Sequence, residues 1–112
     1  MIDVLLAYKI KFGMERRYQE YLGKVLPVTQ AQEPYVLEYR IFQGEDGTFV
    51  QHERYEGEQG LWQHLEVTAA GIADFAAATE ILWVRVLGDI TQELRDFFGV
   101  NHGFTEFRSV VR

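Results

Sequence analysis

The sequence contains no cysteine among its 112 residues. This absence excludes disulfide bonds, thiolate metal sites and cysteine nucleophiles together. Serine occurs once, as Ser109 near the C-terminus, which argues against serine catalysis. There are only two prolines and no stretch of biased composition, so we expect neither a linker nor a low-complexity segment.

Long apolar runs and excess positive charge are also lacking. No apolar run approaches the roughly 20 residues that cross a bilayer. The apolar N-terminal segment carries its basic residues, Lys9 and Lys11, at its end, whereas a signal peptide has them first. The net charge of −6 would repel nucleic acid phosphates. We therefore expect a cytoplasmic protein that binds neither nucleic acid nor a membrane.

Apolar residues are abundant enough for a packed core: 47% of the chain is hydrophobic and 14% is aromatic. The β-formers of Ile2 to Ile10 predict a strand. From Met14 the apolar residues recur every three or four positions, which predicts a helix whose tyrosines pack on a sheet. Pro27 is expected to kink or end this helix, and Glu33-Pro34 to force an extended exit.

The rest of the chain predicts a hairpin, a second helical segment and a last strand. Two β-like runs, 35–43 and 48–56, surround a Gly-Glu-Asp-Gly turn and predict a hairpin. Residues 58–78 are helical in composition, with a break expected at Thr68 and Gly71. A strand over 81–87 follows, and Asp89 is a candidate cap for a short helix over 90–98. Residues 104–111 are a further strand or an arm.

The hairpin register decides which side chains share a face. A loop of two or four residues places Arg40 and Glu53 on one face, together with Glu38, Gln51 and Tyr55. A bulge instead places Tyr39 beside Glu53. The sequence leaves both registers open.

The element order predicts an α+β fold of the ferredoxin-like βαββαβ type, with a four-stranded antiparallel sheet. We expect a single domain over 1–112, with a core over 2–88 and a C-terminal extension over 89–112. Right-handed crossovers put both helical connections on one face of the sheet. The first and last strands are apolar on both faces, so a second copy is expected to cover the other face in a homodimer. Trp83 is expected in the core.

Known chemical motifs are scarce. The three histidines, His52, His64 and His102, have no metal-ligand spacing, although a cluster of His52, Glu53 and His64 is conceivable. We expect no metal. The glycines form no phosphate-binding loop.

Three short motifs resemble those of the antibiotic biosynthesis monooxygenase family of dimeric α/β barrels. The family has Glu-Pro-Gly-x-x-x-Tyr, Glu-x-Trp and Ala-x-x-x-His-Leu in its second strand, third strand and next helix. The matching segments are Glu33-Pro34-Tyr35-Val36-Leu37-Glu38-Tyr39, Glu53-Arg54-Tyr55 and Gly60-Leu61-Trp62-Gln63-His64-Leu65. The similarity covers residues 2–88. Tyr35 replaces the usual glycine and Tyr55 the usual tryptophan.

The chain departs from two subgroups of that family, and haem degradation is disfavoured. Quinol-oxidising relatives carry a second histidine where this chain has Ala69. Haem-degrading relatives have an iron-binding histidine where this chain has Asp74 or Ile72, depending on the alignment, and neither is a usual haem ligand.

The resemblance implies a monooxygenase that uses no cofactor and acts on a small aromatic, quinol-like compound. The residues that it implies are His64, Glu53 and Arg40 as catalytic groups and Trp62, Tyr39 and Tyr55 as substrate-binding groups. His64 is the candidate base, because a histidine pKa lies near neutral pH. Arg40 or Tyr39 would stabilise the anion, and Glu53 would orient either of them.

Other interpretations stay open. Arg40 and Glu53 form a plain cross-strand ion pair in one of them. His64 and Trp62 are two residues apart on a helix and do not share a face, and a helical histidine is usually a surface residue. The alternative functions are a non-catalytic dimeric barrel that binds a small ligand, and an isomerase or lyase that uses His64 or Glu53. The aromatic tail after residue 88 is expected to enclose the pocket or the dimer interface.

Overall fold

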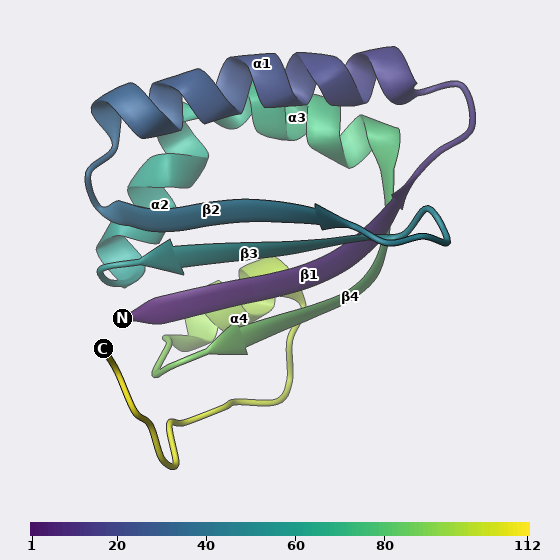
Figure 1. The fold of residues 1–112 in the computed structure, drawn as a ribbon. Coiled ribbons are helices and arrows are strands. Elements are labelled where there is room, and N and C mark those ends of the chain that lie inside the picture. The colour runs from purple at the N-terminus through teal and green to yellow at the C-terminus, as the bar shows by residue number, and fades with distance from the viewer.

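A computed structural model describes residues 1–112 and contains four strands and four helices (Figure 1). In chain order they are β1 (Ile2–Ile10), α1 (Glu15–Gln32), β2 (Val36–Gln43), β3 (Phe49–Tyr55), α2 (Glu58–Val67), α3 (Ala69–Ala78), β4 (Thr79–Leu87) and α4 (Gln92–Phe98). The strands form one antiparallel sheet in the order β2-β3-β1-β4. This arrangement confirms the predicted ferredoxin-like βαββαβ fold.

The helices α1 and α3 pack together over one face of the sheet, as the handedness of the crossovers predicts (Figure 1). Alternate residues of β1 point to this face and are buried there: Ile2, Val4, Leu6 and Tyr8. They form one hydrophobic cluster with residues of α1, α2, β3 and β4, and Leu94 of α4 belongs to the same cluster. The core therefore lies between the helices and one face of the sheet.

The buried face of α1 follows the predicted period, with Tyr18, Tyr21, Val25 and Thr29 three or four residues apart. The helix does not end at Pro27 but continues to Gln32. Proline has no amide hydrogen, so the carbonyl oxygen of Gly23, four residues earlier, loses its helical hydrogen bond. Both Gly23 and Pro27 are exposed. Water can hydrogen-bond this carbonyl, which makes the proline tolerable inside the helix.

The second helical connection breaks at Thr68, as predicted. The Thr68 hydroxyl donates to the carbonyl oxygen of His64 over 2.6 Å, and its amide donates to the same oxygen over 2.9 Å. The Thr68 amide makes the last i to i−4 hydrogen bond of α2, and the Thr68 hydroxyl gives the same oxygen a second donor at the end of the helix. The break lets α3 start in a new direction, along α1.

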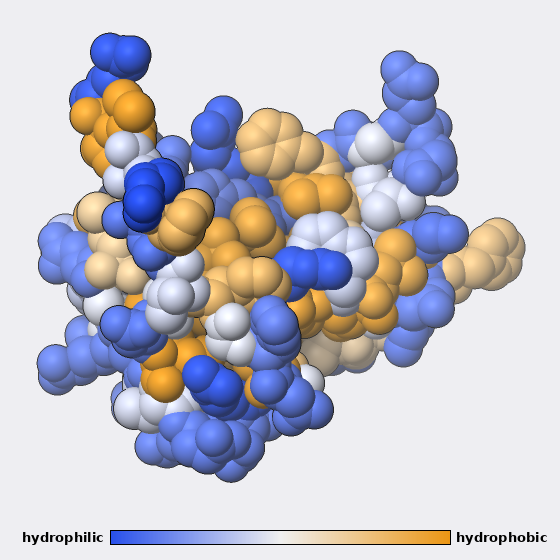
Figure 2. Space-filling view, turned by 90° about the horizontal axis from the view of Figure 1, so that it is seen from below, coloured by the Kyte–Doolittle hydropathy of each residue, from blue (hydrophilic) through white to orange (hydrophobic).

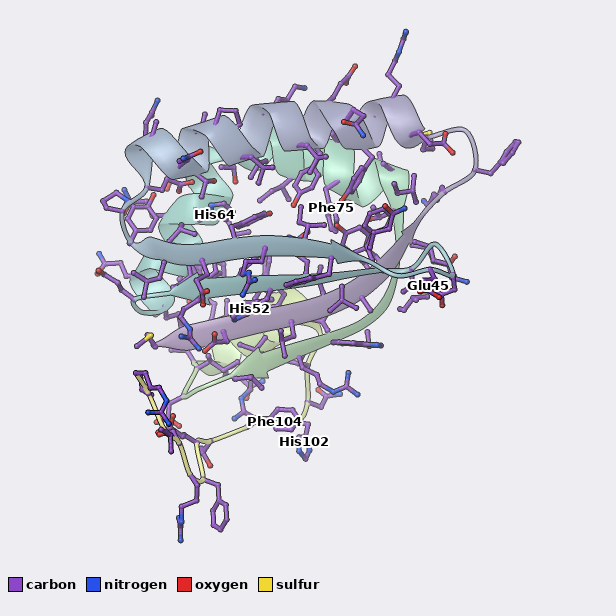
Figure 3. The ribbon with its side chains drawn as sticks, viewed as in Figure 1. Glu45, His52, His64, Phe75, His102 and Phe104 are labelled. Carbon is purple, nitrogen blue, oxygen red and sulfur yellow. The ribbon has the colours of Figure 1, made fainter.

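The region after β4 differs from the prediction in its cap. Helix α4 begins at Gln92, and its N-cap is Thr91, whose hydroxyl accepts from the Leu94 amide over 3.3 Å. Asp89 is not the cap, because the chain needs two more residues to leave the sheet before it turns into a helix. In the tail, only Phe104 pairs with the sheet, through a parallel bridge to Leu87 (Figure 3).

The other face of the sheet is covered by no helix, and apolar side chains gather on it (Figure 2). We call it the open face. The register assigns to it Asp3, Leu5, Ala7, Val50, His52, Arg54, Trp83, Arg85 and Leu87. Trp83 is 38% exposed there, so its predicted core position is wrong for a single chain. None of the helices has the length and hydropathy that a membrane span requires.

Candidate functional site

The β2–β3 hairpin has a three-residue loop, Glu45 to Gly47. Gly47 has φ = 82°, a left-handed conformation that suits glycine, and the Asp46 carboxylate accepts from the Thr48 amide over 3.0 Å. A turn followed by a left-handed residue is the three-residue hairpin with a bulge. The odd loop length places Tyr39 opposite Glu53.

This register confirms the bulge alternative and rules out the pairing of Arg40 with Glu53. Arg40 lies opposite His52, on the open face, and its guanidinium is 5.1 Å from the centre of the Phe42 ring. Because alternate residues of a strand point to opposite faces, Arg40 is outside the interior that holds Glu53. The expected role of Arg40 beside Glu53 is therefore wrong.

Glu53 belongs to a hydrogen-bonded cluster on the helix-covered face. Its carboxylate accepts from Gln51 Nε2 over 2.6 Å and from the Tyr55 hydroxyl over 2.5 Å. Gln51 Nε2 also donates to the Tyr39 hydroxyl over 3.0 Å. The hairpin thus brings together Glu53, Tyr39 and Tyr55, three of the residues predicted for the site.

Three further tyrosines extend this cluster along the core. Gln51 Oε1 accepts from the hydroxyls of Tyr8, at 2.9 Å, and Tyr21, at 3.2 Å. Tyr8 is hydrogen-bonded to Tyr18 over 2.7 Å, and Tyr21 to Tyr39 over 2.5 Å. Burial, and then the charge of Glu53, raises the pKa of Tyr39 well above 10, so this hydroxyl keeps its proton at neutral pH.

His64 faces the same interior from α2, between the helices and the sheet (Figure 3). Only 1% of its surface is exposed, in contrast to a typical helical histidine. Its ring centre is 5.5 Å from that of Tyr39 and 5.6 Å from that of Tyr55. His64 therefore touches two predicted site residues, and Tyr55 connects it to Glu53.

The two nitrogens of His64 have different surroundings. Nδ1 is 2.9 Å from Glu33 Oε1. Nε2 has no hydrogen-bond partner in the protein, whereas every fully buried polar side-chain atom has one. It follows that Nε2 is the polar tip through which the buried imidazole meets solvent.

Glu33 is the site residue that sequence reasoning missed. It is 2% exposed, and its carboxylate accepts from the Thr29 hydroxyl over 3.0 Å and from the Tyr35 hydroxyl over 2.6 Å, in addition to His64. The sequence marked Glu33 as the residue before a proline and as the first residue of a family-like motif, but not as a site residue. Thr29 and Tyr35 are close in sequence and offered a local signal, but His64 is 31 positions away.

A surface groove of about 440 Å³ lies beside this pair. It runs between the C-terminal half of α1 and β2. Its lining residues are Leu26, Thr29, Gln30, Glu33, Pro34, Val36, Leu37, Glu38 and Tyr39. His64 itself does not line the groove, but two of the lining residues, Glu33 and Tyr39, contact it.

Trp62 lies elsewhere, as its spacing from His64 predicts. Its indole Nε1 donates to Glu58 over 3.1 Å, and its ring meets the Phe97 ring edge-on at 5.4 Å. Trp62 thus joins α2 to α4 and does not line the groove. Its expected position beside His64 as a substrate wall is not observed.

The conceivable metal cluster of His52, Glu53 and His64 is not assembled. His52 lies on the open face, where its Nε2 is 2.6 Å from Asp3 Oδ1. Glu53 and His64 lie on the other side of the sheet. No three or more His, Asp or Glu side chains come together as a metal site would require.

No protein-family model matches the sequence, and no curated protein matches it. Solved structures do match. The protein MupZ from Pseudomonas fluorescens is 21% identical, with a TM-score of 0.78 over 99% of this chain and 93% of its own. Rv0793 from Mycobacterium tuberculosis is 19% identical, with a TM-score of 0.65 over 80% of this chain and 95% of its own.

A structure named antibiotic biosynthesis monooxygenase is 22% identical, with a TM-score of 0.62 over 81% of this chain and all of its own. Structures from Caulobacter crescentus and Deinococcus radiodurans carry the same family name. This is the fold of the antibiotic biosynthesis monooxygenases. At these identities the likeness concerns the antibiotic biosynthesis monooxygenase fold, and the chemistry has to be inferred from the site.

Proposed function

We propose that the protein is a cofactor-independent monooxygenase that binds a small aromatic, quinol-like compound in the groove between α1 and β2. The observation that carries this proposal is the Glu33–His64 pair beside the groove, with His64 Nε2 free of protein partners. A histidine ring nitrogen without a protein partner, next to residues that line a groove, is suited to take a proton from a phenol or an activated carbon acid.

His64, Glu33 and Tyr39 have different roles in the proposed proton transfer. Nε2 accepts the substrate proton, and the imidazolium that forms lies against the Glu33 carboxylate. Tyr39 lines the groove and its hydroxyl keeps its proton at neutral pH. We propose that this proton, which is donated to Tyr21 in the free protein, is donated to the substrate anion when the substrate is bound. Tyr39 therefore takes the anion-stabilising role that the sequence also allowed for Arg40.

The substrate anion then supplies the electrons for dioxygen. One electron passes from the anion to dioxygen, giving a substrate radical and superoxide, which combine to a peroxide. Loss of water from this peroxide turns a CH₂ carbon of the substrate into a carbonyl. One oxygen atom of dioxygen ends in the product and the other in water with two substrate hydrogens, so the substrate provides all four electrons.

We also propose that the protein is a homodimer in which two open faces pack about a twofold axis. Val50 and Trp83 lie there on either side of Ala7, with more than a third of their surfaces exposed. An exposed apolar patch of this kind marks an interaction surface. The face also carries both signs of charge, in Asp3 and Arg54, so that a copy of itself is electrostatically compatible with it.

A binding module without catalysis is the second candidate function. The observation that favours it is the filling of the core around His64 by large tyrosine side chains whose hydroxyls are all hydrogen-bonded within the protein. A ligand would then occupy the groove and reach no reactive atom. The fold accommodates both functions.

Oxygen consumption separates the two functions. Hydroquinones and anthrones are supplied to the wild type, to His64→Ala and to His102→Ala, with a chelator present. His102 is an exposed histidine of the tail and serves as the matched control. The proposed oxygenase is supported if the wild type and His102→Ala consume oxygen faster than autoxidation does and His64→Ala does not. Uptake that survives in His64→Ala excludes His64 as the base, and no uptake above autoxidation with any compound favours the binding module.

A further inference from the structure

The mechanism proposed above uses His64 Nε2 and leaves Glu33 without an assigned role beyond its charge. Glu33 is a buried carboxylate at the junction of α1 and β2, and no lysine or arginine side chain contacts it. A carboxylate in such a place needs hydrogen-bond donors to offset its lost hydration. It has three, and one of them is the imidazole of His64.

We infer that Glu33 is a positioning residue that keeps the proton of neutral His64 on Nδ1 and so leaves the lone pair on Nε2 free to accept a proton. This inference rests on the proposed function of His64. It goes further by stating which nitrogen reacts and which residue determines it.

The donor count around Glu33 supports this tautomer. An ionised carboxylate only accepts hydrogen bonds. Thr29 and Tyr35 donate their hydroxyl protons to Oε1 and Oε2. The contact of 2.9 Å between Oε1 and His64 Nδ1 therefore needs the proton on Nδ1. A neutral imidazole with its proton on Nδ1 has its acceptor lone pair on Nε2.

The packing around the ring keeps His64 in this orientation. The rings of Tyr39 and Tyr55 lie against the imidazole, and Thr68 binds the carbonyl of His64 at the end of α2. A ring turned by half a revolution would place a carbon at Glu33 and lose the hydrogen bond. A carboxylate that binds one ring nitrogen in this way fixes the tautomer and stabilises the imidazolium after proton uptake.

The experiment compares Glu33→Ala, the isosteric Glu33→Gln and Tyr35→Phe as the matched control. Tyr35→Phe removes one hydroxyl from the same carboxylate but leaves the His64 contact. The tautomer of His64 is measured by the nitrogen chemical shifts of the imidazole, in the full-length protein at a pH where the ring is neutral. Oxygen uptake with an anthrone, which has the CH₂ carbon that the proposed reaction oxidises, is measured on the same samples.

We expect the Nδ1–H tautomer in the wild type and in Tyr35→Phe, and a shift toward Nε2–H in Glu33→Ala, where Nδ1 has no acceptor. Oxygen uptake should fall by about 100-fold in Glu33→Ala, at the low end of what a positioned base contributes. If Glu33→Ala does not fold, the same fall in Glu33→Gln, which keeps the shape but not the charge, supports the inference.

Two results would overturn the inference. One is an Nε2–H tautomer in the wild type, and the other is wild-type uptake in both Glu33 variants while His64→Ala is inactive. The second result leaves the oxygenase intact. Conversely, a shift of tautomer in Glu33→Ala without any wild-type uptake keeps the positioning role and removes the proposed function.

Discussion

Gly71 of α3 lies directly against Val25 of α1, and a Cβ atom at Gly71 would come within 2.5 Å of Val25 Cγ2. Val25 is fully buried, so it has no room to move away. We expect Gly71→Ala to destabilise the protein, because overpacking costs ~1–3 kcal/mol. The gain in helix propensity is at most about 1 kcal/mol and does not offset this cost. Urea denaturation measures the difference.

Gly23→Ala is the matched control, since a Cβ at Gly23 of α1 meets no atom within 4 Å. This variant should be more stable than the wild type by up to about 1 kcal/mol. Combining Gly71→Ala with Val25→Ala should cost less than the sum of the two single changes, because the second removes the clash. Equal stability of Gly71→Ala and the wild type would contradict the close packing of α1 on α3.

Asp74 couples the stability of the protein to acid pH. Hydrogen bonds from Lys24, at 2.7 Å, and Arg17, at 2.9 Å, lower the pKa of its carboxyl below 3.8. A lowered pKa adds stability above the unfolded value of 3.8, and this stability is lost as the pH falls through the folded value. The wild type should therefore lose more stability below pH 4 than Asp74→Asn does. Chemical denaturation at pH 6 and pH 3 tests this, and an identical loss in both proteins would refute it.

The six tyrosines predict the behaviour of the protein in alkali. Burial is the largest cause that raises the pKa of each of them above 10, and it raises the pKa of Tyr35 to about 12. Because the fold favours the neutral form of these tyrosines, their full contribution to stability is present below pH 10. This contribution is lost as the pH rises through their pKa values in the folded protein.

We therefore expect that few tyrosines ionise near pH 10 while the chain is folded, and that tyrosinate absorbance rises together with the loss of helical circular dichroism. The unfolded chain in urea, titrated in parallel, should ionise its tyrosines near pH 10. A folded protein that titrates most of its tyrosines near pH 10 would be inconsistent with the buried cluster.

The open face predicts a dimer that a single charge disrupts. Val50→Lys should convert the protein from a dimer to a species of 13.0 kDa in analytical ultracentrifugation. Val50 is 37% exposed in the single chain, so the change should leave the monomer fold intact. Phe12→Lys is the control, because Phe12 is fully exposed and lies away from the sheet. A wild type that sediments as a monomer at micromolar concentration would exclude the dimer.

Much of the fold could be predicted because its signals are local. The period of α1, the Asp-Gly turn and the break at Thr68 each depend on residues within a few positions of one another, and the structure has them where the patterns put them. Two local features differ from the expectation: α1 does not end at Pro27, and Asp89 is not the cap of α4. They depend on solvent access and on the direction in which the chain leaves β4. Neither quantity can be read from neighbouring residues.

The candidate site was predictable in residue type but not in arrangement. His64, Tyr39, Tyr55 and Glu53 do come together, whereas Arg40 does not. The difference comes from one residue in the hairpin loop, since a register change by one residue moves every side chain to the other face. Trp62 was separable from His64 by helix geometry alone.

The sequence by itself determined the order of the elements and which face of each is apolar, because helical and strand periods are properties of short segments. Only the tertiary structure decided that Glu33 and His64, 31 positions apart, share a hydrogen bond in the interior. Such a pair forms because α1, β2 and α2 pack together and exclude water, and the strength of a buried polar contact depends on that exclusion. The tertiary structure also decided that Arg40 faces outward, through a loop of three residues rather than two or four.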